Sequence, residues 1–130
     1  KENLMEKIIF IALGGGIGSA LRYGITQLAT RYGAVSLPYG TVLANTIGSF
    51  CIGLLFVFFT QTSSLPPTVK LFFVTGILGG FTTFSTYNME LLTLVRTGDI
   101  LSAAAYFSLN VIGGFLCCWL GFAVGNAFWQ

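Results

Sequence analysis

Four long apolar stretches follow one another along the chain, with short polar segments between them. They cover about residues 7–29, 39–60, 69–95 and 101–128. Each stretch is long enough to cross a bilayer, because about 20 apolar residues suffice for a transmembrane helix. The segments between them are rich in Ser, Thr, Pro, Gly or charged residues, as loops usually are. The pattern therefore predicts an all-α integral membrane protein with four transmembrane helices in a single transmembrane domain, residues 1–130.

Composition supports this class of protein. Of the 130 residues, 55% are hydrophobic and only 8% are charged, whereas a soluble domain carries about 25% charged residues. The net charge of +2 is too small to indicate a nucleic-acid partner. There is no histidine, no nucleophile–base–acid set, and no metal-ligand spacing among the three cysteines. We therefore expect no enzymatic activity.

The third stretch contains an unusual central segment, Gly-Gly-Phe-Thr-Thr-Phe-Ser-Thr-Tyr at 79–87. A helix of the full stretch would be about 40 Å long, and the hydrocarbon core is only about 30 Å thick. The segment can therefore unwind for several residues and still cross. We predict a helix broken near Gly79–Thr83 whose unwound centre forms an ion site, as such breaks do in other membrane proteins. The alternative is a glycine-kinked helix whose hydroxyls bond to their own backbone.

The second and fourth stretches each carry a line of polar residues at helical spacing. Thr41 and Asn45 are followed by Gly48 and Ser49, and Tyr106 is followed by Asn110 and Gly114 at intervals of four. Asn45 needs a partner in lipid. It can bond to a neighbouring helix, but the hydroxyls beside it favour a pore wall.

Two charged residues within the stretches are ambiguous. Arg22 is either an interfacial arginine that snorkels to the membrane surface or a cation at a pore mouth that concentrates anions. Glu90 shares a helix face with Thr86 and is either an interfacial carboxylate or a functional one. The glycines before Arg22 lack the strand and βαβ unit of a dinucleotide site. Gly14 and Gly18 instead allow close helix packing.

The basic residues give no clear orientation in the membrane. One side carries Lys1, Lys7 and Lys70, and the other carries Arg31 and Arg96, with Arg22 as a candidate third. A chain without a preference can insert both ways. We therefore predict an antiparallel dual-topology homodimer, which would bring two broken helices together at its centre.

These motifs resemble those of the Fluc (CrcB) family of fluoride channels. The resemblance rests on Gly-Gly-Phe-Thr-Thr-Phe-Ser-Thr at 79–86, Gly-x-x-x-Arg ending at Arg22, Gly-Thr-x-x-x-Asn at 40–45, and Tyr106 with a polar residue four positions later. It covers all four stretches. It implies a homodimer in the cell inner (plasma) membrane that exports fluoride passively through two pores, with a structural Na⁺ at the dimer centre.

The resemblance also implies particular site residues. The Na⁺ would be held by the backbone carbonyls of Gly79 and Thr82. The paired phenylalanines of the family correspond to Phe84 and Tyr87, where tyrosine replaces the usual phenylalanine, and Asn110 stands where serine is frequent. The predicted anion pathway consists of Thr41, Asn45, Phe84, Ser85, Thr86, Tyr87, Tyr106 and Asn110, with Arg22 and Glu90 nearer its ends.

Two other functions fit a small protein of four spans. A dual-topology exporter of cationic drugs or metabolites is similar in size but relies on a carboxylate embedded in its first span. Here the first span offers Arg22 and no acid after Glu6. A subunit that only assembles would leave the polar lines without a purpose.

Overall fold

The computed structural model describes residues 2–33 and 37–129, and all the regular secondary structure in these ranges is helical. Its helical segments are α1 (Leu4–Tyr32), α2 (Tyr39–Gln61), α3 (Pro67–Lys70), the π-helical η1 (Leu71–Leu78), α4 (Gly79–Phe81), α5 (Phe84–Arg96) and α6 (Ile100–Trp129). The segments α3, η1, α4 and α5 together form one bent crossing from Pro67 to Arg96. This crossing, α1, α2 and α6 are each long and apolar enough to span a membrane. The predicted class and the four spans are confirmed.

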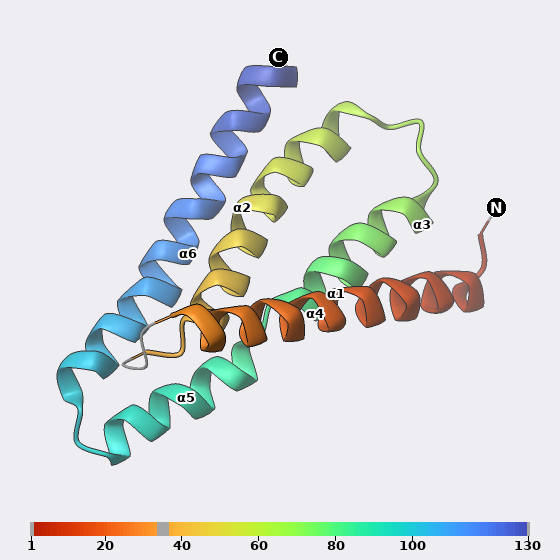
Figure 1. The fold of residues 1–130 in the computed structure, drawn as a ribbon. Helices are drawn as coiled ribbons and strands as arrows, with labels where there is room; N and C mark the ends of the chain where they lie inside the picture. The colour runs from red at the N-terminus through yellow and green to blue at the C-terminus, as the bar shows by residue number, and fades with distance from the viewer. Residues whose placement is uncertain (1, 34–36, 130) are drawn as a thin grey trace.

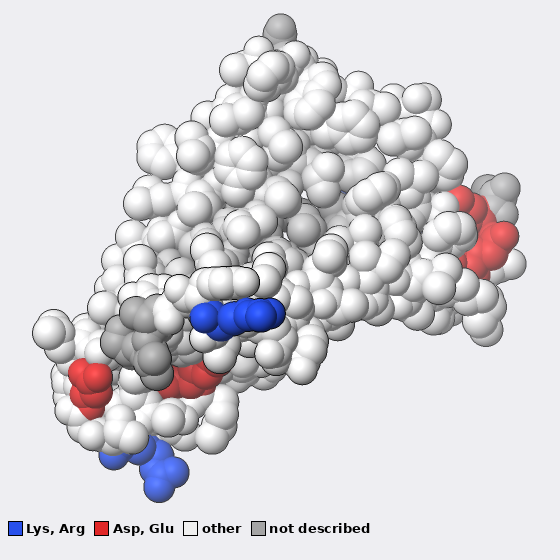
Figure 2. Space-filling view, in the orientation of Figure 1, with Lys and Arg blue, Asp and Glu red and all other residues white. Residues whose placement is uncertain are grey.

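Most charged residues lie near the ends of the four candidate spans, whereas Arg22 and Glu90 lie within them. Figure 2 shows that most of the visible face is uncharged and that its acidic side chains gather toward the two ends. At one end, Asn3 and Glu6 form a capping box that starts α1. At the other end, Gly98 adopts φ 82°, which suits glycine, in the turn between α5 and α6. The Asp99 carboxylate then accepts the Ser102 N–H at 3.2 Å and starts α6.

The helices form two closely packed groups that cross near α4 (Figure 1). α1 packs along η1 and α4, and α2 runs beside α6 in the same direction. Glycines allow both contacts: a Cβ on Gly18 would overlap the Ile77 carbonyl oxygen, and one on Gly121 would overlap that of Phe50. This is the close approach through small residues that drives helix association in lipid.

The third crossing breaks at Thr82 and Thr83. Both residues are extended, with φ/ψ of −86°/158° and −150°/122°, and α5 starts directly after them. The predicted break near Gly79–Thr83 is thus confirmed, but the two glycines are not the unwound residues. Gly79 and Gly80 are helical, and the absence of a side chain on Gly80 lets it lie against the Gly15 main chain of α1. Gly80 therefore serves packing, and the unwound residues are the two threonines.

Candidate functional site

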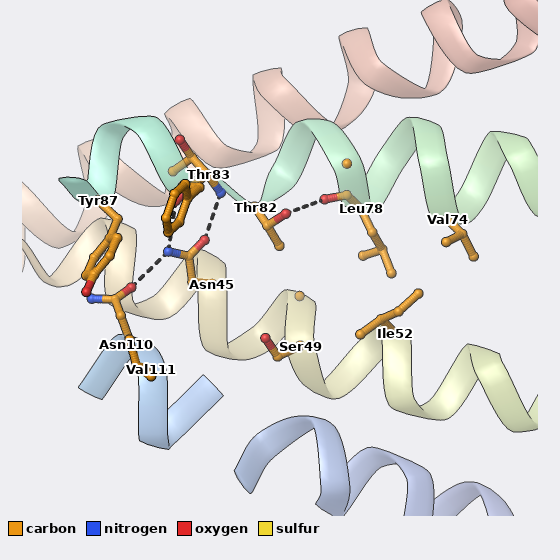
Figure 3. A pocket seen from close by; sticks show the side chains of 13 residues that line it. Asn45, Ser49, Ile52, Val74, Leu78, Thr82, Thr83, Tyr87, Asn110 and Val111 are labelled. Carbon is orange, nitrogen blue, oxygen red and sulfur yellow. Dashed lines mark hydrogen bonds between the residues drawn. The ribbon is translucent and has the colours of Figure 1, made fainter. Parts of the chain in front are cut away.

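The helix break is held by one side chain from α2. The Asn45 amide oxygen accepts the Thr83 N–H at 2.8 Å, and its amide nitrogen donates to the Thr83 carbonyl at 3.1 Å. The same nitrogen donates to the Asn110 amide oxygen of α6 at 2.8 Å. Figure 3 shows Asn45 between these two partners. Asn45 thereby satisfies backbone groups that the break has released, which is how non-helical backbone persists at membrane depth.

The break also leaves two helix ends facing the same region. In a continuous helix the Thr83 N–H would bond to the Gly79 carbonyl, but here it bonds to Asn45. The last carbonyls of α4 and the first amides of α5 lack intrahelical partners, as at every helix end. Thr83 caps α5 by accepting the Thr86 N–H on its hydroxyl oxygen at 3.2 Å. A partial negative charge at the end of α4 therefore meets a partial positive charge at the start of α5.

A cavity of about 420 Å³ lies beside the break. Its walls come from α2, the bent crossing and α6, and they comprise Asn45, Gly48, Ser49, Ile52, Val74, Leu78, Gly79, Thr82, Thr83, Phe84, Tyr87, Asn110 and Val111. We call it the break cavity. It contains both predicted carbonyl residues, Gly79 and Thr82, and four of the predicted anion-pathway residues. It opens at the surface of the chain, because Phe84 is 76% exposed.

The two asparagines of the break cavity are oriented by the protein itself. Both N–H groups of Asn45 are used, one on Thr83 and one on Asn110. Asn110 accepts the latter bond and donates one N–H to the Tyr106 carbonyl at 3.1 Å. Asn45 thus bonds to neighbouring helices, as one alternative from the sequence expects, and it also lines the break cavity. An anion can take a hydrogen bond from Asn45 only by replacing one of these partners.

A second cavity, of about 410 Å³, lies between the end of α1, the start of α2 and α5. We call it the Glu90 cavity, and it is lined by Thr26, Ala29, Thr30, Leu37, Pro38, Tyr39, Gly40, Thr41, Glu90, Thr93 and Leu94. The Glu90 carboxylate accepts the Tyr106 hydroxyl at 2.5 Å. Tyr106 is fully buried. The predicted residues Thr41 and Glu90 therefore belong to a different cavity from Asn45 and Phe84.

Three aromatic rings lie in a row, and the first two, Phe84 and Tyr87, line the break cavity. The Phe84 and Tyr87 ring centroids are 5.9 Å apart, and those of Tyr87 and Tyr106 are 5.6 Å apart. Phe84 is exposed, whereas Tyr87 is only 5% exposed. Phe84 and Tyr87 therefore lie side by side as predicted, but only Phe84 presents most of its ring to the outside of the chain.

The remaining predicted residues lie around the break. The Arg22 side chain donates from Nε to the Gly80 carbonyl at 3.1 Å. Arg22 is therefore beside the break, ten residues before the end of α1. Ser85 is exposed and lines neither cavity, and Thr86 is half-buried beside Thr83.

Two features of the site were not predicted from the sequence. Thr83 is both the partner of Asn45 and the cap of α5, and the pairing of Glu90 with Tyr106 was not foreseen. A signal for the pairing exists, since these residues are 16 apart and centred on Gly98, in the turn of an antiparallel helical hairpin. No comparable local signal exists for the contact between Asn45 and Thr83.

Comparisons with known proteins cover almost the whole chain. A family model described as "CrcB-like protein, Camphor Resistance (CrcB)" matches residues 9–122. A protein of Flavobacterium psychrophilum named "Fluoride-specific ion channel FluC" is 39% identical over 94% of this chain and 98% of its own length. A protein with the same name from Roseiflexus is 46% identical over 84% of this chain and 91% of its own length. One from Aquifex aeolicus is 38% identical over 95% of this chain and 99% of its own.

Proposed function

Because this chain belongs to the CrcB-like family, we propose that it is a fluoride-selective ion channel that exports fluoride passively across the plasma membrane. The observation that carries the proposal is the similarity of 37–46% over nearly the full length to relatives named fluoride-specific ion channels. The matched residues include both cavities and the helix break. The function is therefore transport, and the chain is not an enzyme.

The chemistry of the break cavity suits a small, strongly hydrated anion. Fluoride must exchange its water for other donors. The first amides of α5 and the positive edge of the Phe84 ring can supply weak contacts of this kind. The positive end of the α5 dipole favours negative charge at the same place. A series of weak sites allows an anion both to enter and to leave.

The exporter of cationic drugs is not supported. Its carboxylate would have to lie within the first span, but Glu6 is in the first turn of α1, where its side chain accepts the Asn3 N–H in the capping box. The relatives are named fluoride-specific ion channels, which is a different activity from the export of cations. A subunit without transport would not release any ion from vesicles, which a direct assay can detect.

That assay is efflux from proteoliposomes. Vesicles loaded with fluoride, chloride or a lipophilic cation are made permeable to K⁺ with an ionophore, and release of each ion is followed with a selective electrode. We expect rapid loss of fluoride and retention of chloride and of the organic cation. Protein-free vesicles are the control for leakage. Retention of fluoride by vesicles that contain folded protein would refute the proposal.

We further propose that two copies pair in antiparallel orientation. Phe84 is 76% exposed at the mouth of a cavity that contains freed backbone. In hydrocarbon such backbone has to be buried in protein or line a wet cavity, and a second copy placed over the break would do both. The near-equal basic residues on the two sides fit insertion in both orientations.

Cysteine labelling tests this arrangement. The native cysteines, Cys51, Cys117 and Cys118, are first replaced, and a single cysteine is added after the C-terminus. In whole cells, an impermeant reagent should label about half of the copies from outside and the rest only after permeabilisation. Labelling from one side alone would rule out dual topology.

We also propose a structural Na⁺ between the two copies, bound by the carbonyls of Gly79 and Thr82. Both residues line the break cavity, and the Gly79 carbonyl has lost its regular donor to Asn45. Half-helix ends and unwound carbonyls are known to coordinate Na⁺ in transporters. No cluster of His, Cys, Asp or Glu that could hold a metal ion occurs in the described ranges, which favours backbone ligands. The residues present therefore fit a hard monovalent cation.

The cation is tested by assembly as well as by transport. Replacing Na⁺ throughout by a large organic cation should lower the stability of the dimer, measured by size-exclusion chromatography and by thermal denaturation. Restoring Na⁺ should recover both. Equal assembly and equal fluoride efflux in the organic cation would show that the carbonyls need no metal.

A further inference from the structure

An apolar cavity of about 440 Å³ lies between the end of α1 and the start of α2. We call it the Leu43 cavity, and its walls include Ile25, Leu28, Tyr32, Tyr39 and Leu43. Leu28, Tyr32 and Leu43 are between 43% and 77% exposed, so the cavity opens at the surface of the chain. Two helices therefore form a hollow here, where a single helix would present a convex surface.

The Leu43 cavity faces away from the helix break. Leu43 and Asn45 are two residues apart on α2, so their side chains point about 200° apart around the helix axis. Asn45 lines the break cavity, over which the second copy is proposed to lie. With the second copy in that place, lipid surrounds the opposite side of α2 and covers the Leu43 cavity.

The Leu43 cavity also lies at the boundary between lipid chains and headgroups. α1 has 29 residues and is thus about 44 Å long, whereas the hydrocarbon core is about 30 Å thick. The last turn of α1 therefore reaches the polar boundary of the bilayer. Tyr32 and Tyr39 combine an apolar ring with a polar hydroxyl, and such side chains are enriched at this level. One end of the cavity thus meets acyl chains and the other end meets headgroups.

Arg31 places a positive charge beside this cavity. It is in the last turn of α1, and its guanidinium carbon lies 5.7 Å from the centre of the Tyr32 ring. The Tyr32 side chain belongs to the cavity wall. A guanidinium that stacks on a ring still presents N–H donors at its edge, and these match a phosphate in bidentate geometry. An apolar cavity and a cation suited to phosphate therefore adjoin each other.

We propose that the Leu43 cavity binds one anionic phospholipid. One acyl chain occupies the cavity, and the phosphate contacts Arg31. Apolar burial alone gives little selectivity inside a bilayer, because the surrounding chains are equally apolar. A chain in the hollow between two helices has van der Waals contacts on more sides than a chain on a single helix. The cavity therefore slows exchange of the lipid, and Arg31 selects its headgroup.

The headgroup preference follows from charge. Phosphatidylglycerol carries a net negative charge, whereas phosphatidylcholine adds a quaternary ammonium group that Arg31 repels. One basic residue near anionic headgroups changes the affinity about fivefold. The wild type should therefore prefer phosphatidylglycerol to phosphatidylcholine by about this factor.

The first experiment measures this preference by native mass spectrometry. The dimer is purified in mild detergent, incubated with equal amounts of the two phospholipids with identical acyl chains, and scored for the lipid that each chain retains. Arg31→Gln should abolish the preference, and Arg31→Lys, which keeps the charge but loses the bidentate geometry, should retain part of it. Arg96→Gln is the matched control. Arg96 is exposed in the last turn of α5, so its replacement removes the same charge at another helix end and should leave the preference unchanged.

Two results of this experiment would overturn the proposal. Equal retention of both phospholipids by the wild type would show that the cavity does not select a headgroup. Equal loss of the preference in Arg31→Gln and Arg96→Gln would show that only the total charge of the protein matters. An assembly larger than the dimer would also overturn it if replacing Ile25 by tryptophan abolished that assembly, because a further copy of the chain would then cover the cavity.

The second experiment fills the cavity. Ile25 is half-buried in its wall, so Ile25→Trp should displace the acyl chain. Phosphatidylglycerol should then raise the melting temperature of the wild type, as a ligand of the folded state does, but not that of the variant. Ile17→Trp is the matched control on the same helix, because Ile17 is 45% exposed and lines none of the three cavities described. It should respond to the lipid as the wild type does.

Two checks keep this second experiment decisive. Each variant is tested for dimer formation, and Leu43→Trp replaces Ile25→Trp if the latter does not assemble. An equal rise in melting temperature in the wild type and in the filled variant would refute the site. Neither experiment measures transport, so loss of the lipid preference would leave the proposed fluoride channel untouched, and absence of fluoride efflux would leave the lipid site untouched.

Discussion

Asn45→Ala should destabilise the fold more than any other single truncation at the break cavity. The substitution removes three hydrogen bonds and leaves the Thr83 N–H, the Thr83 carbonyl and the Asn110 amide oxygen without their partner. Interhelical hydrogen bonds in membrane proteins contribute about 0.6 kcal/mol on average and up to about 1.7 kcal/mol. For three such bonds around released backbone, we expect a loss of about 2–4 kcal/mol in the free energy of unfolding.

The loss can be measured by reversible unfolding in mixed micelles of mild detergent and sodium dodecyl sulfate. Trp119 and Trp129 of α6 provide the fluorescence signal. Protein concentration must be held constant, because association contributes to stability by mass action. Ser49→Ala is the matched control. Ser49 lies one turn further along the same face of α2 and lines the same cavity, so its truncation should cost no more than about 0.5 kcal/mol.

A double-mutant cycle measures how much of this loss in stability comes from the bond between Asn45 and Asn110. Asn110→Ala removes the bond between the two asparagines and the bond from Asn110 to the Tyr106 carbonyl. If the structure describes the site correctly, Asn45→Ala and Asn110→Ala together should cost less than the sum of the two, by about the coupling of one interhelical hydrogen bond, 0.6 kcal/mol. An Asn45→Ala protein within about 0.5 kcal/mol of the wild type would refute the reasoning, because the break would then be held by packing alone.

Three other predictions follow from the structure. Phe84→Ile keeps bulk but removes the positive ring edge, so it should abolish fluoride efflux from vesicles while the dimer still forms. Tyr87→Phe keeps the ring and should largely preserve efflux. Gly18→Ala should lower thermal stability because its methyl group would overlap the Ile77 main chain, while Gly16→Ala, with open space around it, should not. Glu2→Ala removes the carboxylate that accepts both the N–H and the hydroxyl of Thr68 at the start of α3, and should speed hydrogen exchange in the first turn of that helix.

The number and extent of the helices could be predicted from the sequence because they depend on local composition. Apolar stretches of sufficient length form helices in lipid whatever their partners are. The observed helices exceed the predicted spans by at most three residues at either end. Capping residues outside the apolar stretches, such as Asn3 and Asp99, account for part of this difference.

The position of the break could not be predicted to the residue. A glycine pair suggests unwinding because it permits many backbone conformations. Here Gly80 is used for contact with α1, and the backbone opens at Thr83, where Asn45 supplies the replacement hydrogen bonds. This contact joins residues 38 apart in the sequence. No local pattern specifies such a pairing.

The candidate site could likewise be predicted only in part. The sequence predicts the residue types of the anion pathway, because the lines through Thr41 and Tyr106 recur at helical spacing. It does not show that Thr41 and Asn45 line different cavities, since that depends on how the helices pack. The pairing of Tyr106 with Glu90 could have been predicted, because a short turn fixes which residues of a helical hairpin lie opposite each other.

The bond between Arg22 and Gly80 has a consequence for how the chain is made. Arg22 enters the membrane with the first span, and its acceptor lies 58 residues later. At about 5–20 residues per second, synthesis of that acceptor takes roughly 3–12 s. During this time an arginine near the middle of a helix costs about 2.5–3.5 kcal/mol in the membrane. Span one is therefore inserted in a metastable state, and the arrival of the third span completes its folding rather than merely adding a neighbour.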